Sequence, residues 1–478
     1  MSKPLSLTCI ECKKEYKYIS SIEYRCPDCK GLLWFKADIN SIKEKFPLIK
    51  TINNIWDYKF SFPPISSDFH ITLGEGGTPC SISKKYGKQL GIEKLYFKDE
   101  SQNPTNSFKD RCAALLISHA RSWEFKKFIC ASNGNQGASI AAYTSIEGME
   151  CLNIIPKKID VGKKAQMIAY NSDLKLVGET VDDAIDYILK QKDISEYYQC
   201  TPELNPLTLE AEKTIAYEII TQIGKIDLLI IPMGSGELLV SLWKGFNELK
   251  DANIITTIPK LVGVQSQISS PIVSEFLEVE KYNQPNKEIH NSLALGVLVK
   301  KPIYKELAIK CIKESEGTVI AVPENLILSS IDTLIRSEGI FAEPASALTF
   351  GAIQMLKQKN IFKGQDIIVC LITASGLKAP YVLEAISSQT TTKGSGSIFI
   401  TKLKILSQIS LTSTKGISGT EIQEIMGTIT RTAIYQHLKA LEEKDLIFRK
   451  KEGKNVLYYI SDTGKKVLDA LDVLMTLL

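Results

Sequence analysis

Nine residues from Asn103 to Arg111, with the sequence NPTNSFKDR, place one lysine at an expected helix start. The Asn-Pro and Thr-Asn-Ser residues favour a turn and a helix N-cap, and the apolar stretch CAALLISHA follows. A lysine serves as a Schiff-base nucleophile when its position is fixed and its setting is partly desolvated. Lys109 fits that need, although most lysines in a first helical turn are simply solvated. The segment therefore makes Lys109 a candidate nucleophile, and its role depends on the rest of the chain.

Four cysteines near the N-terminus form a second group with chemical potential. They are arranged as two Cys-x-x-Cys pairs: Cys9, Cys12, Cys26 and Cys29. Each pair can present two thiolates to one tetrahedral ion, and four such ligands leave no position for catalysis. A segment of this size (residues 1–36) cannot bury a core of its own, so we expect structural zinc to stabilise a small ribbon. The alternative is a degenerate ribbon with free thiols, since the intervening loop is shorter than the usual spacing.

The composition is that of an ordinary globular protein. The chain has 478 residues, 44% hydrophobic and 23% charged, which is enough for two or three domains. Its formal net charge of +4 is too small to indicate a nucleic-acid partner by itself. No apolar run approaches the length of a bilayer span, and the N-terminus lacks the pattern of a secretory leader. The remaining cysteines are scattered, which suits a reducing compartment, so we expect a cytoplasmic protein without a membrane partner.

Between about residue 40 and residue 386 the pattern alternates between strands and helices. Apolar strands are expected at KLYFKDE, FKKFICAS, LLIIPMGSG, KLVGVQS and DIIVCLITA, with helices between them. Strands without polar alternation indicate parallel sheets covered by helices on both faces, an α/β fold. Ligands bind beyond the carboxyl ends of such strands, and the motifs at Asn135, Gly234 and Thr373 fall there. The turn from Gly234 to Leu238 suits a phosphate dianion, although a tight packing turn is the commoner reading of so short a glycine motif.

The C-terminal part has a different character. Residues 388–397, SQTTTKGSGS, are a polar, Gly/Ser-rich linker. Three helices, a hairpin with Glu452-Gly453 near its tip and a final helix follow in residues 398–478, the order of a winged helix-turn-helix. This segment has 12 Lys+Arg against 9 Asp+Glu, a net charge of +3, and its basic residues favour contact with DNA: Arg431, Lys439, Arg449, Lys450, Lys451 and Lys454. The alternative is a dimerisation or ligand-sensing module, and the mostly apolar last helix is a candidate dimer seam.

The lysine motif resembles that of threonine synthases, within the fold-type II (tryptophan synthase beta-like) family of pyridoxal-phosphate enzymes. The resemblance covers roughly residues 9–386, and some threonine synthases carry a similar N-terminal ribbon. It implies a catalytic domain of two α/β subdomains (residues 37–387). Members of the family are often dimers, so a homodimer is expected. Further blocks agree in the family's order: LGEGGTP (73–79), NGNQGASIAAY (133–143), GKKAQMIAY (162–170), NPLTLEAEKTIAYEI (205–219), PMGSGELLVSLWKGFNEL (232–249), EGIFAEPASAL (338–348) and TASGLK (373–378).

The resemblance also assigns roles around pyridoxal 5'-phosphate. Lys109 would carry the cofactor, and Asn135 would hydrogen-bond its ring hydroxyl oxygen. Thr373, with Ser375 as a rival, would face the pyridine nitrogen, and a neutral hydroxyl there favours elimination and replacement. The phosphate would lie against Gly234, Ser235, Gly236, Glu237 and Leu238. Because a carboxylate beside a phosphate is unfavourable, we expect the Glu237 side chain to point away.

The implied reaction is that of threonine synthase, with O-phospho-L-homoserine and water giving L-threonine and phosphate. Lys109 would act as the general base at the substrate Cα, with a pKa lowered by desolvation. Lys163 and Lys213 are candidate contacts of the substrate phosphate. The chain departs from the family pattern at several positions, which leaves the exact substrate open: Asn106 in place of glycine, Asn133 and Gln136 in place of hydroxyl residues, Glu237, and no aspartate after TASGLKAP.

Two other kinds of function remain open on the sequence. One is a different replacement or elimination enzyme of the same fold, such as cysteate synthase acting on phosphoserine, or threonine or serine dehydratase. The other is a transcriptional regulator whose enzyme-like domain senses an amino acid or pyridoxal phosphate. The intact Lys109, glycine turn and Thr373 argue against a sensor without catalytic activity.

Overall fold

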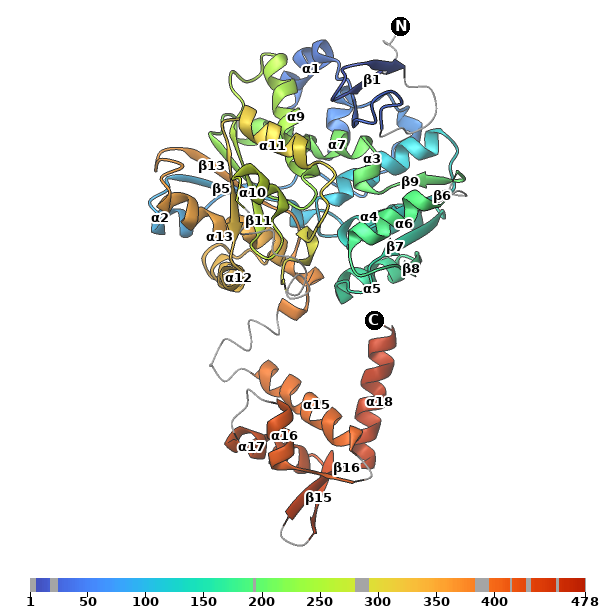
Figure 1. Cartoon of the computed structure of the whole chain (residues 1–478), viewed down its shortest axis with the longest axis vertical. Coiled ribbons are helices and arrows are strands. Elements are labelled where there is room, and N and C mark those ends of the chain that lie inside the picture. The colour runs from blue at the N-terminus through green and yellow to red at the C-terminus, as the bar shows by residue number, and fades with distance from the viewer. Residues whose placement is uncertain are drawn as a thin grey trace. The chain divides into compact units, whose positions relative to one another are not determined.

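The structure is a computed structural model, and its chain divides into two compact units, residues 1–382 and 383–478 (Figure 1). Of the predicted linker 388–397, residues 388–394 lie outside the described residues, and the rest begin a helix. Among the described helices, none combines the length and apolar character that a bilayer-crossing segment requires. The described residues are 6–17, 25–191, 195–279, 292–382, 395–412, 415–426, 431–452 and 455–477, with the backbone alone at 395–400, 452, 455 and 470–477.

The larger unit contains a six-stranded sheet in the order β12-β11-β10-β13-β5-β4. All neighbouring strands are parallel except β4, which pairs antiparallel with β5 at the edge. The predicted strands β5, β10, β11 and β13 are confirmed, and their observed ends lie within four residues of the predicted ones. The strands are β4 (Cys80–Ile82), β5 (Lys94–Asp99), β10 (Leu228–Pro232), β11 (Lys260–Ser266), β12 (Thr318–Val322) and β13 (Ile367–Ile372).

Helices cover both faces of this sheet, because its central strands are apolar on both sides. On one face, Leu229 and Ile231 of β10 belong to a core shared with α8, α9, α10 and α11. On the other face, Phe97 of β5 stacks on Phe350 of α13, with ring centroids 6.0 Å apart. The helices are α8 (Thr214–Ile223), α9 (Glu237–Asp251), α10 (Pro271–Phe276), α11 (Lys305–Glu314), α12 (Glu324–Glu338) and α13 (Pro344–Gln358).

A second, four-stranded parallel sheet has the order β8-β7-β6-β9. Phe128 and Cys130 of β6 pack against α3 and α4 on one face, whereas Ile129 and Ala131 pack against α6 on the other. The elements are β6 (Lys127–Ala131), β7 (Glu150–Ile155), β8 (Asp173–Leu176), β9 (Tyr197–Gln199), α3 (Lys109–Ser122), α4 (Asn135–Ile146), α5 (Val161–Ala169) and α6 (Val181–Lys190). The two sheets, each covered by helices, confirm the predicted α/β fold with parallel sheets.

The N-terminal ribbon is a three-stranded antiparallel sheet in the order β2-β1-β3. It packs on the larger unit, where Trp34 of β3 stacks on Trp243 of α9 with ring centroids 6.1 Å apart. Through this contact the ribbon packs against the main hydrophobic core. The remaining elements here are β1 (Ser6–Cys9), β2 (Glu15–Lys17), β3 (Leu33–Phe35), α1 (Ile39–Lys45), α2 (Tyr86–Gln89) and α7 (Leu207–Glu212).

The smaller unit has the predicted order of three helices, a hairpin and a last helix. Ser418 and Glu421 form the expected capping box, because the Glu421 amide donates to Ser418 Oγ at 3.2 Å and the Ser418 amide donates to Glu421 Oε2 at 2.8 Å. Gly453, at the predicted hairpin tip, lies outside the described residues. The elements are α15 (Ser395–Leu411), β14 (Ile417–Ser418), α16 (Gly419–Met426), α17 (Arg431–Glu442), β15 (Ile447–Glu452), β16 (Asn455–Ile460) and α18 (Asp462–Leu477).

Candidate active site

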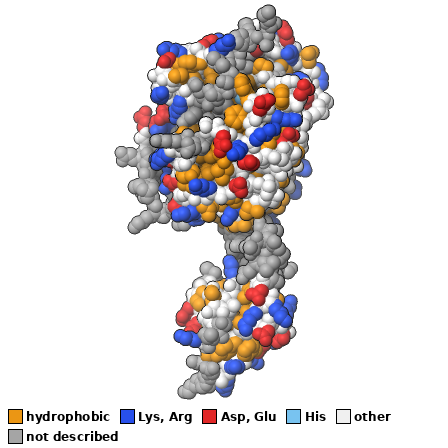
Figure 2. Space-filling view, turned by 90° about the vertical axis from the view of Figure 1, so that its right-hand side faces the viewer, with side chains coloured by type: hydrophobic (Ala, Val, Ile, Leu, Met, Phe, Trp, Pro, Cys, Tyr) orange, Lys and Arg blue, Asp and Glu red, His pale blue; other side chains and the backbone are white. Residues whose placement is uncertain are grey.

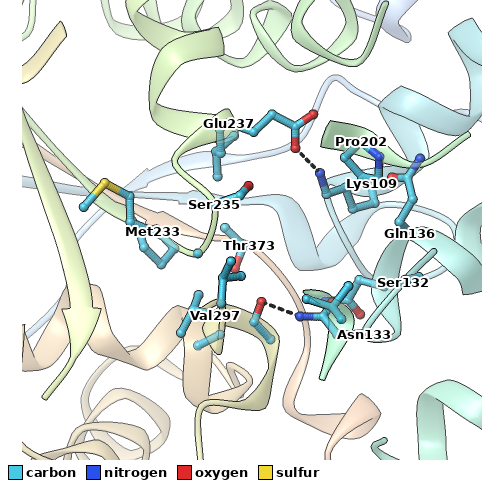
Figure 3. Close-up of a pocket in the computed structure, with 18 of the residues that line it drawn as sticks. Lys109, Ser132, Asn133, Gln136, Pro202, Met233, Ser235, Glu237, Val297 and Thr373 are labelled. Atoms are coloured by element: carbon cyan, nitrogen blue, oxygen red, sulfur yellow. Dashed lines mark hydrogen bonds and ion pairs between the residues drawn. The ribbon is translucent and has the colours of Figure 1, made fainter. Parts of the chain in front are cut away.

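A pocket in the larger unit lies where the carboxyl ends of β6, β10 and β13 meet the start of α3 (Figure 3). Its empty volume is about 770 Å³, part of it open to solvent, which is a common size for a small-molecule site. The motifs at Asn135, Gly234 and Thr373 meet there, as expected for ligand sites in parallel sheets. The residues that line the pocket include Lys109, Asn133, Asn135, Gln136, Glu203, residues 234–238, Glu343 and Thr373.

The turn before Lys109 is fixed by backbone hydrogen bonds to the end of β13. The amide of Phe108 donates to the Thr373 carbonyl at 3.0 Å, and the Ser375 amide donates to the Asn106 carbonyl at 3.0 Å. Asn106 has a φ of 64°, in the left-handed region that glycine and asparagine tolerate best. The asparagine at this family glycine position is therefore compatible with the same turn, and Lys109 begins α3 as predicted.

A buried ion cluster anchors the helix just after Lys109. Arg111 donates to Glu100 Oε2 at 2.7 Å and to Glu218 Oε1 at 2.6 Å, and Lys98 donates to Glu218 Oε2 at 2.6 Å. Burial opposes the ionised form of Glu218, but the Arg111 and Lys98 cations hold its pKa at about 2. The two cations and two carboxylates therefore compensate one another and fix α3 against β5 and α8.

The amine of Lys109 is held by two carboxylates. Its Nζ lies 2.6 Å from Glu212 Oε1 and 2.9 Å from Glu237 Oε2, and its side chain is 12% exposed. Burial alone would lower the pKa of Lys109, but these carboxylates raise it well above its ordinary value. The predicted lowering of the lysine pKa by desolvation is therefore wrong for the structure without ligand.

The orientation predicted for Glu237 is also wrong. Its side chain points into the pocket toward Lys109 (Figure 3), because the buried ammonium group offers a charge partner. Glu203 lies nearby, and burial together with Glu237 raises its pKa to about 7. The pocket wall next to the glycine turn is therefore acidic.

The turn between β10 and α9 has the geometry expected of an anion cradle. Gly236 has a φ of 92°, and a Cβ atom there would lie 2.9 Å from the Cβ of Ala308, so the turn requires glycine. The first amides of α9 have no carbonyl partner within the helix and carry the positive end of its dipole. Gly234, Ser235, Gly236, Glu237 and Leu238 all line the pocket.

Asn135 and Thr373 line the pocket at the ends of β6 and β13. Asn135 Nδ2 donates to Glu343 Oε1 at 3.1 Å, and Asn135 Oδ1 is buried without a partner in the described part of the chain. Thr373 Oγ1 lies 2.7 Å from Ser346 Oγ. Ser375, the rival for the role of Thr373, is not among the residues that line the pocket and accepts from the Leu377 amide at 3.3 Å.

Neither lysine proposed for substrate phosphate presents a free charge to the pocket. Lys163 Nζ is buried between Asp160 at 2.8 Å and Glu343 at 3.0 Å. Lys213 Nζ is buried 2.5 Å from Glu210, outside the pocket lining. Among the described residues that line the pocket, Lys109 is the one cationic side chain.

Sequence reasoning missed Glu203, Glu212 and Glu343 as site residues. Glu212 and Glu343 lie inside motif blocks that were quoted for the resemblance, and Glu203 lies two residues before one of them. The signal was present as acidic residues in otherwise apolar, buried segments, where an unpaired carboxylate is costly. Their roles depend on contacts with distant segments, such as Glu212 with Lys109 and Glu343 with Asn135 and Lys163, which no local pattern specifies.

Comparison with known families agrees with this geometry. Residues 71–374, more than half of the chain, match the family described as pyridoxal-phosphate dependent enzyme. The chain belongs to this family. Residues 402–478 match the family described as HxlR-like helix-turn-helix, in agreement with the winged-helix order of the smaller unit.

Curated relatives cover most of the chain. A threonine synthase of Methanocaldococcus jannaschii is 35% identical over 378 residues, 78% of this chain and 92% of the relative. A threonine synthase of Methanosarcina acetivorans is 32% identical over the same shares of the two chains. The aligned length equals the span expected for the ribbon and catalytic domain together.

Solved structures confirm the α/β fold of this family. An L-serine ammonia-lyase from Rhizomucor miehei has a TM-score of 0.55 and 16% identity, and covers 67% of this chain and 99% of the lyase. An O-ureido-L-serine synthase has a TM-score of 0.53 and 15% identity, and covers 68% of this chain and 96% of that one. At these identities the likeness concerns the fold alone.

The residues of the pocket fit the family's cofactor. A lysine amine lies inside the pocket, the α9 turn needs Gly236 and offers helix-start amides, and Asn135 keeps an amide oxygen without a partner. The acidic side chains of Glu203 and Glu237 are the unusual element, because a carboxylate beside a phosphate dianion is unfavourable.

The four N-terminal cysteines converge as expected for a metal site. Their sulfur atoms all lie within 4.8 Å of one another. Cys9 Sγ and Cys29 Sγ are 3.4 Å apart, and Cys12 Sγ and Cys26 Sγ are 3.7 Å apart. Zinc–sulfur bonds of about 2.3 Å in a tetrahedron require sulfur atoms about 3.8 Å apart, so the donor set and its size fit zinc.

The basic residues of the smaller unit are partly paired with acidic ones. Arg449 lies 3.2 Å from Glu442, and Lys439 lies 3.9 Å from Glu443. On the face shown in Figure 2, lysines and arginines are intermixed with acidic side chains. Lys450 Nζ lies 5.5 Å from the ring centre of Tyr459, and Lys454, also predicted for DNA contact, lies outside the described residues.

Proposed function

We propose that this protein is a threonine synthase that converts O-phospho-L-homoserine and water to L-threonine and phosphate. The observation that carries the proposal is the position of Lys109, whose Nζ lies in a pocket between the α9 turn, Asn135 and Thr373. The curated threonine synthases named above support it over the length of the larger unit.

Each part of the cofactor has a partner in this proposal. Lys109 would hold the aldehyde, Asn135 the ring hydroxyl and Thr373 the pyridine nitrogen. The phosphate would lie against Gly234, Ser235, Gly236, Glu237 and Leu238. When bound, pyridoxal phosphate supplies an electron-withdrawing ring that stabilises negative charge on the substrate.

The chain's own residues then move protons. Lys109 Nζ takes the proton from the substrate Cα. Loss of a Cβ proton allows phosphate to leave from Cγ, and water adds at Cβ to give threonine. The Thr373 hydroxyl is oriented by Ser346 at 2.7 Å, and as a neutral group it leaves the pyridine nitrogen largely unprotonated.

A direct assay tests this function. The full chain is purified with pyridoxal phosphate, O-phospho-L-homoserine is added, and threonine and phosphate are measured together. We expect both products in equal amounts from the wild type and neither from Lys109→Ala. A visible cofactor absorbance without turnover would keep the cofactor site and reject the substrate.

One observation favours a second candidate, the deamination of threonine or serine. Lys109 is the one cation among the described pocket residues, and two carboxylates neutralise it. A substrate phosphate therefore meets no unpaired positive side chain in the described pocket. Keto-acid formation from threonine or serine, without any reaction of O-phospho-L-homoserine, would select this candidate.

Structural zinc at Cys9, Cys12, Cys26 and Cys29 is part of the proposal. The converging sulfur atoms support it, because four thiolates close a tetrahedral shell and stabilise a small ribbon. Metal analysis of the purified chain tests it, with one zinc per chain expected.

We also propose that the smaller unit contacts DNA and regulates or localises the enzyme. The HxlR-like match and the net charge of +3 of residues 398–478 support contact with DNA. We expect the full chain to be retained on genomic DNA fragments. After cleavage in the segment 388–394, the larger unit should no longer be retained. Equal retention of the cleaved larger unit would reject this role.

A homodimer in the cytoplasm completes the proposal. The apolar sequence VLDALDVLMTLL at the end of the chain is typical of a helix seam. None of the eleven cysteines, all of which lie in the described part of the chain, forms a disulfide, which suits a reducing compartment. Sedimentation of the full chain tests the dimer.

A further inference from the structure

Glu212 differs from the other acidic residues of the pocket in how firmly it is held beside Lys109. Its Oε1 accepts from Lys109 Nζ at 2.6 Å and from Cys112 Sγ at 3.2 Å, while Ser241 Oγ donates to its Oε2 at 3.2 Å. The carboxylate is fully buried on α7. Contacts from α3 and α9 therefore fix it beside the lysine amine.

Glu237 has a different position with respect to the phosphate cradle. It is the first residue of α9, immediately after Gly236, and its carboxylate reaches Lys109 across the pocket. A phosphate dianion at the helix start repels this carboxylate, because like charges interact strongly in a poorly solvated site. Glu212 is not part of the cradle, and its contacts with Cys112 and Ser241 lie outside residues 234–238.

The lysine needs such a neighbour, because an ammonium group has no lone pair with which to attack an aldehyde. Its side chain is only 12% exposed, and its charge is stabilised by the two carboxylates. The proton must therefore pass to a group that touches Nζ, and only a carboxylate that stays in place can return it later.

We propose that Glu212 is the proton acceptor of Lys109, an inference that rests on the proposed role of Lys109 as the cofactor lysine. Glu212 takes one proton from the ammonium group, and the neutral amine adds to the aldehyde carbon. The carbonyl oxygen leaves as water with the two remaining amine hydrogens, and a carbon–nitrogen double bond forms. The reverse transfer reprotonates the amine when hydrolysis releases the cofactor from Lys109.

The charges around this pair set its working range. The groups that face it are Lys109 and Cys112 on α3, Glu237 on α9, Glu203 and Tyr304. Burial, with a contribution from Glu237, raises the pKa of Glu212 to about 7, although Lys109 lowers it. A proton acceptor works best when its pKa lies near the working pH. At pH values below its pKa the acceptor is already protonated and cannot take another proton. The rate of cofactor attachment should therefore fall as the pH falls through about 7.

The test follows cofactor attachment without turnover. Cofactor-free full-length chain is mixed with pyridoxal phosphate at a series of pH values, and the rate at which visible absorbance appears is measured. Glu212→Gln keeps the size and hydrogen-bonding capacity of the side chain but cannot take a proton. We expect Glu212→Gln to bind the cofactor about 100-fold more slowly than the wild type at pH 7. Its rate of attachment should no longer decrease as the pH is lowered through about 7.

Two matched variants separate this role from simple charge effects. Glu237→Gln removes a negative charge from the cradle, so it should react faster than the wild type. Glu203→Gln removes the other carboxyl group with a pKa of about 7 and should retain the fall of the rate at low pH. A fall that disappears in Glu203→Gln and persists in Glu212→Gln would overturn the proposal.

The sign of the Glu212→Gln effect is decisive. If Glu212 only holds the lysine as an ion pair, its neutralisation lowers the lysine pKa and makes attachment equally fast or faster, which would overturn the proposal. Circular dichroism checks the fold of each variant. If Glu212→Gln does not fold, Glu212→Asp replaces it; retention of the pH dependence supports the proposal, and its loss refutes it. Absence of absorbance in the wild type would instead refute the role of Lys109.

Discussion

The backbone amide of Phe108 donates to the carbonyl of Thr373 at 3.0 Å, which joins the turn before Lys109 directly to the end of β13. The lysine proposed as catalytic and the hydroxyl proposed for the pyridine nitrogen thus share one backbone connection. Positions on either side of this connection should affect cofactor attachment through geometry, without touching the cofactor.

Asn106 provides the first prediction. Its φ of 64° suits glycine and asparagine but strains a β-branched residue. Asn106→Val should therefore lower the free energy of unfolding by about 1–2 kcal/mol, whereas Asn106→Gly should change it by less than about 1 kcal/mol. Urea unfolding of both variants measures this difference, and equal destabilisation would contradict a left-handed turn here.

Arg111 provides a prediction about the buried ion cluster. Arg111→Met leaves Glu100 and Glu218 without their main partner, which should destabilise the protein by about 3–5 kcal/mol. Arg121 lies on the same helix and pairs with Glu147 at 3.4 Å near the surface, so Arg121→Met should cost less than about 1 kcal/mol. Similar unfolding midpoints for the two variants would show that the buried cluster is not an anchor.

The free energy of unfolding at acidic pH should depend on Glu218. Its pKa of about 2 is lower in the folded protein than its ordinary value of 4.5, so its contribution is complete above about pH 4.5 and is lost as the pH falls toward 2. The difference in unfolding free energy between the wild type and Glu218→Gln should shrink across this range. Denaturant titrations at several pH values measure it, and a constant difference would contradict the assignment.

Gly236 tests the phosphate cradle. A Cβ atom there lies 2.9 Å from Ala308 Cβ, whereas a Cβ atom at Gly339, which also has a positive φ, meets nothing within 4 Å. Gly339→Ala therefore measures backbone strain alone, of about 1–2 kcal/mol. Gly236→Ala should add a loss of pyridoxal-phosphate affinity of about tenfold or more, equal to about 1.4 kcal/mol. Equal affinity in the two variants would place the phosphate elsewhere.

Removal of metal should affect the ribbon and spare the cofactor site. Cys12→Ser should abolish zinc binding, because three thiolates no longer close the tetrahedral shell. Since Trp34 stacks on Trp243 at 6.1 Å, tryptophan emission should shift when the ribbon loosens. Unchanged emission together with lost zinc would show that the ribbon folds without the ion.

Local sequence features predicted much of the fold because the same features determine where strands, turns and helices form. The apolar run LLIIP can be buried only in a central strand, and Asn-Pro marks the turn before the helix at Lys109. The predicted Thr-Asn-Ser cap is wrong, because the N-cap is Phe108 without a side-chain hydrogen bond. The edge strand β4 was not predicted, because three residues of intermediate or high exposure carry no apolar pattern.

The electrostatic setting of the site was predicted less well. The glycine turn, Asn135 and Thr373 follow strands and were placed correctly at the pocket. The pairing of Lys109 with Glu212 and Glu237 was not foreseen, because the three residues are brought together by α3, α7 and α9 from distant parts of the chain. Charge pairing between such segments is a tertiary property, and it reversed the predicted direction of the lysine pKa.

The most direct test of the central claim is to map the lysine that binds the cofactor. The full chain is incubated with pyridoxal phosphate and reduced with borohydride, and the modified peptide is identified by mass spectrometry. We predict one pyridoxyl group per chain, on Lys109, with none on Lys109→Ala. A modification confined to another lysine, or none in the wild type, would contradict the assignment of this pocket as the active site.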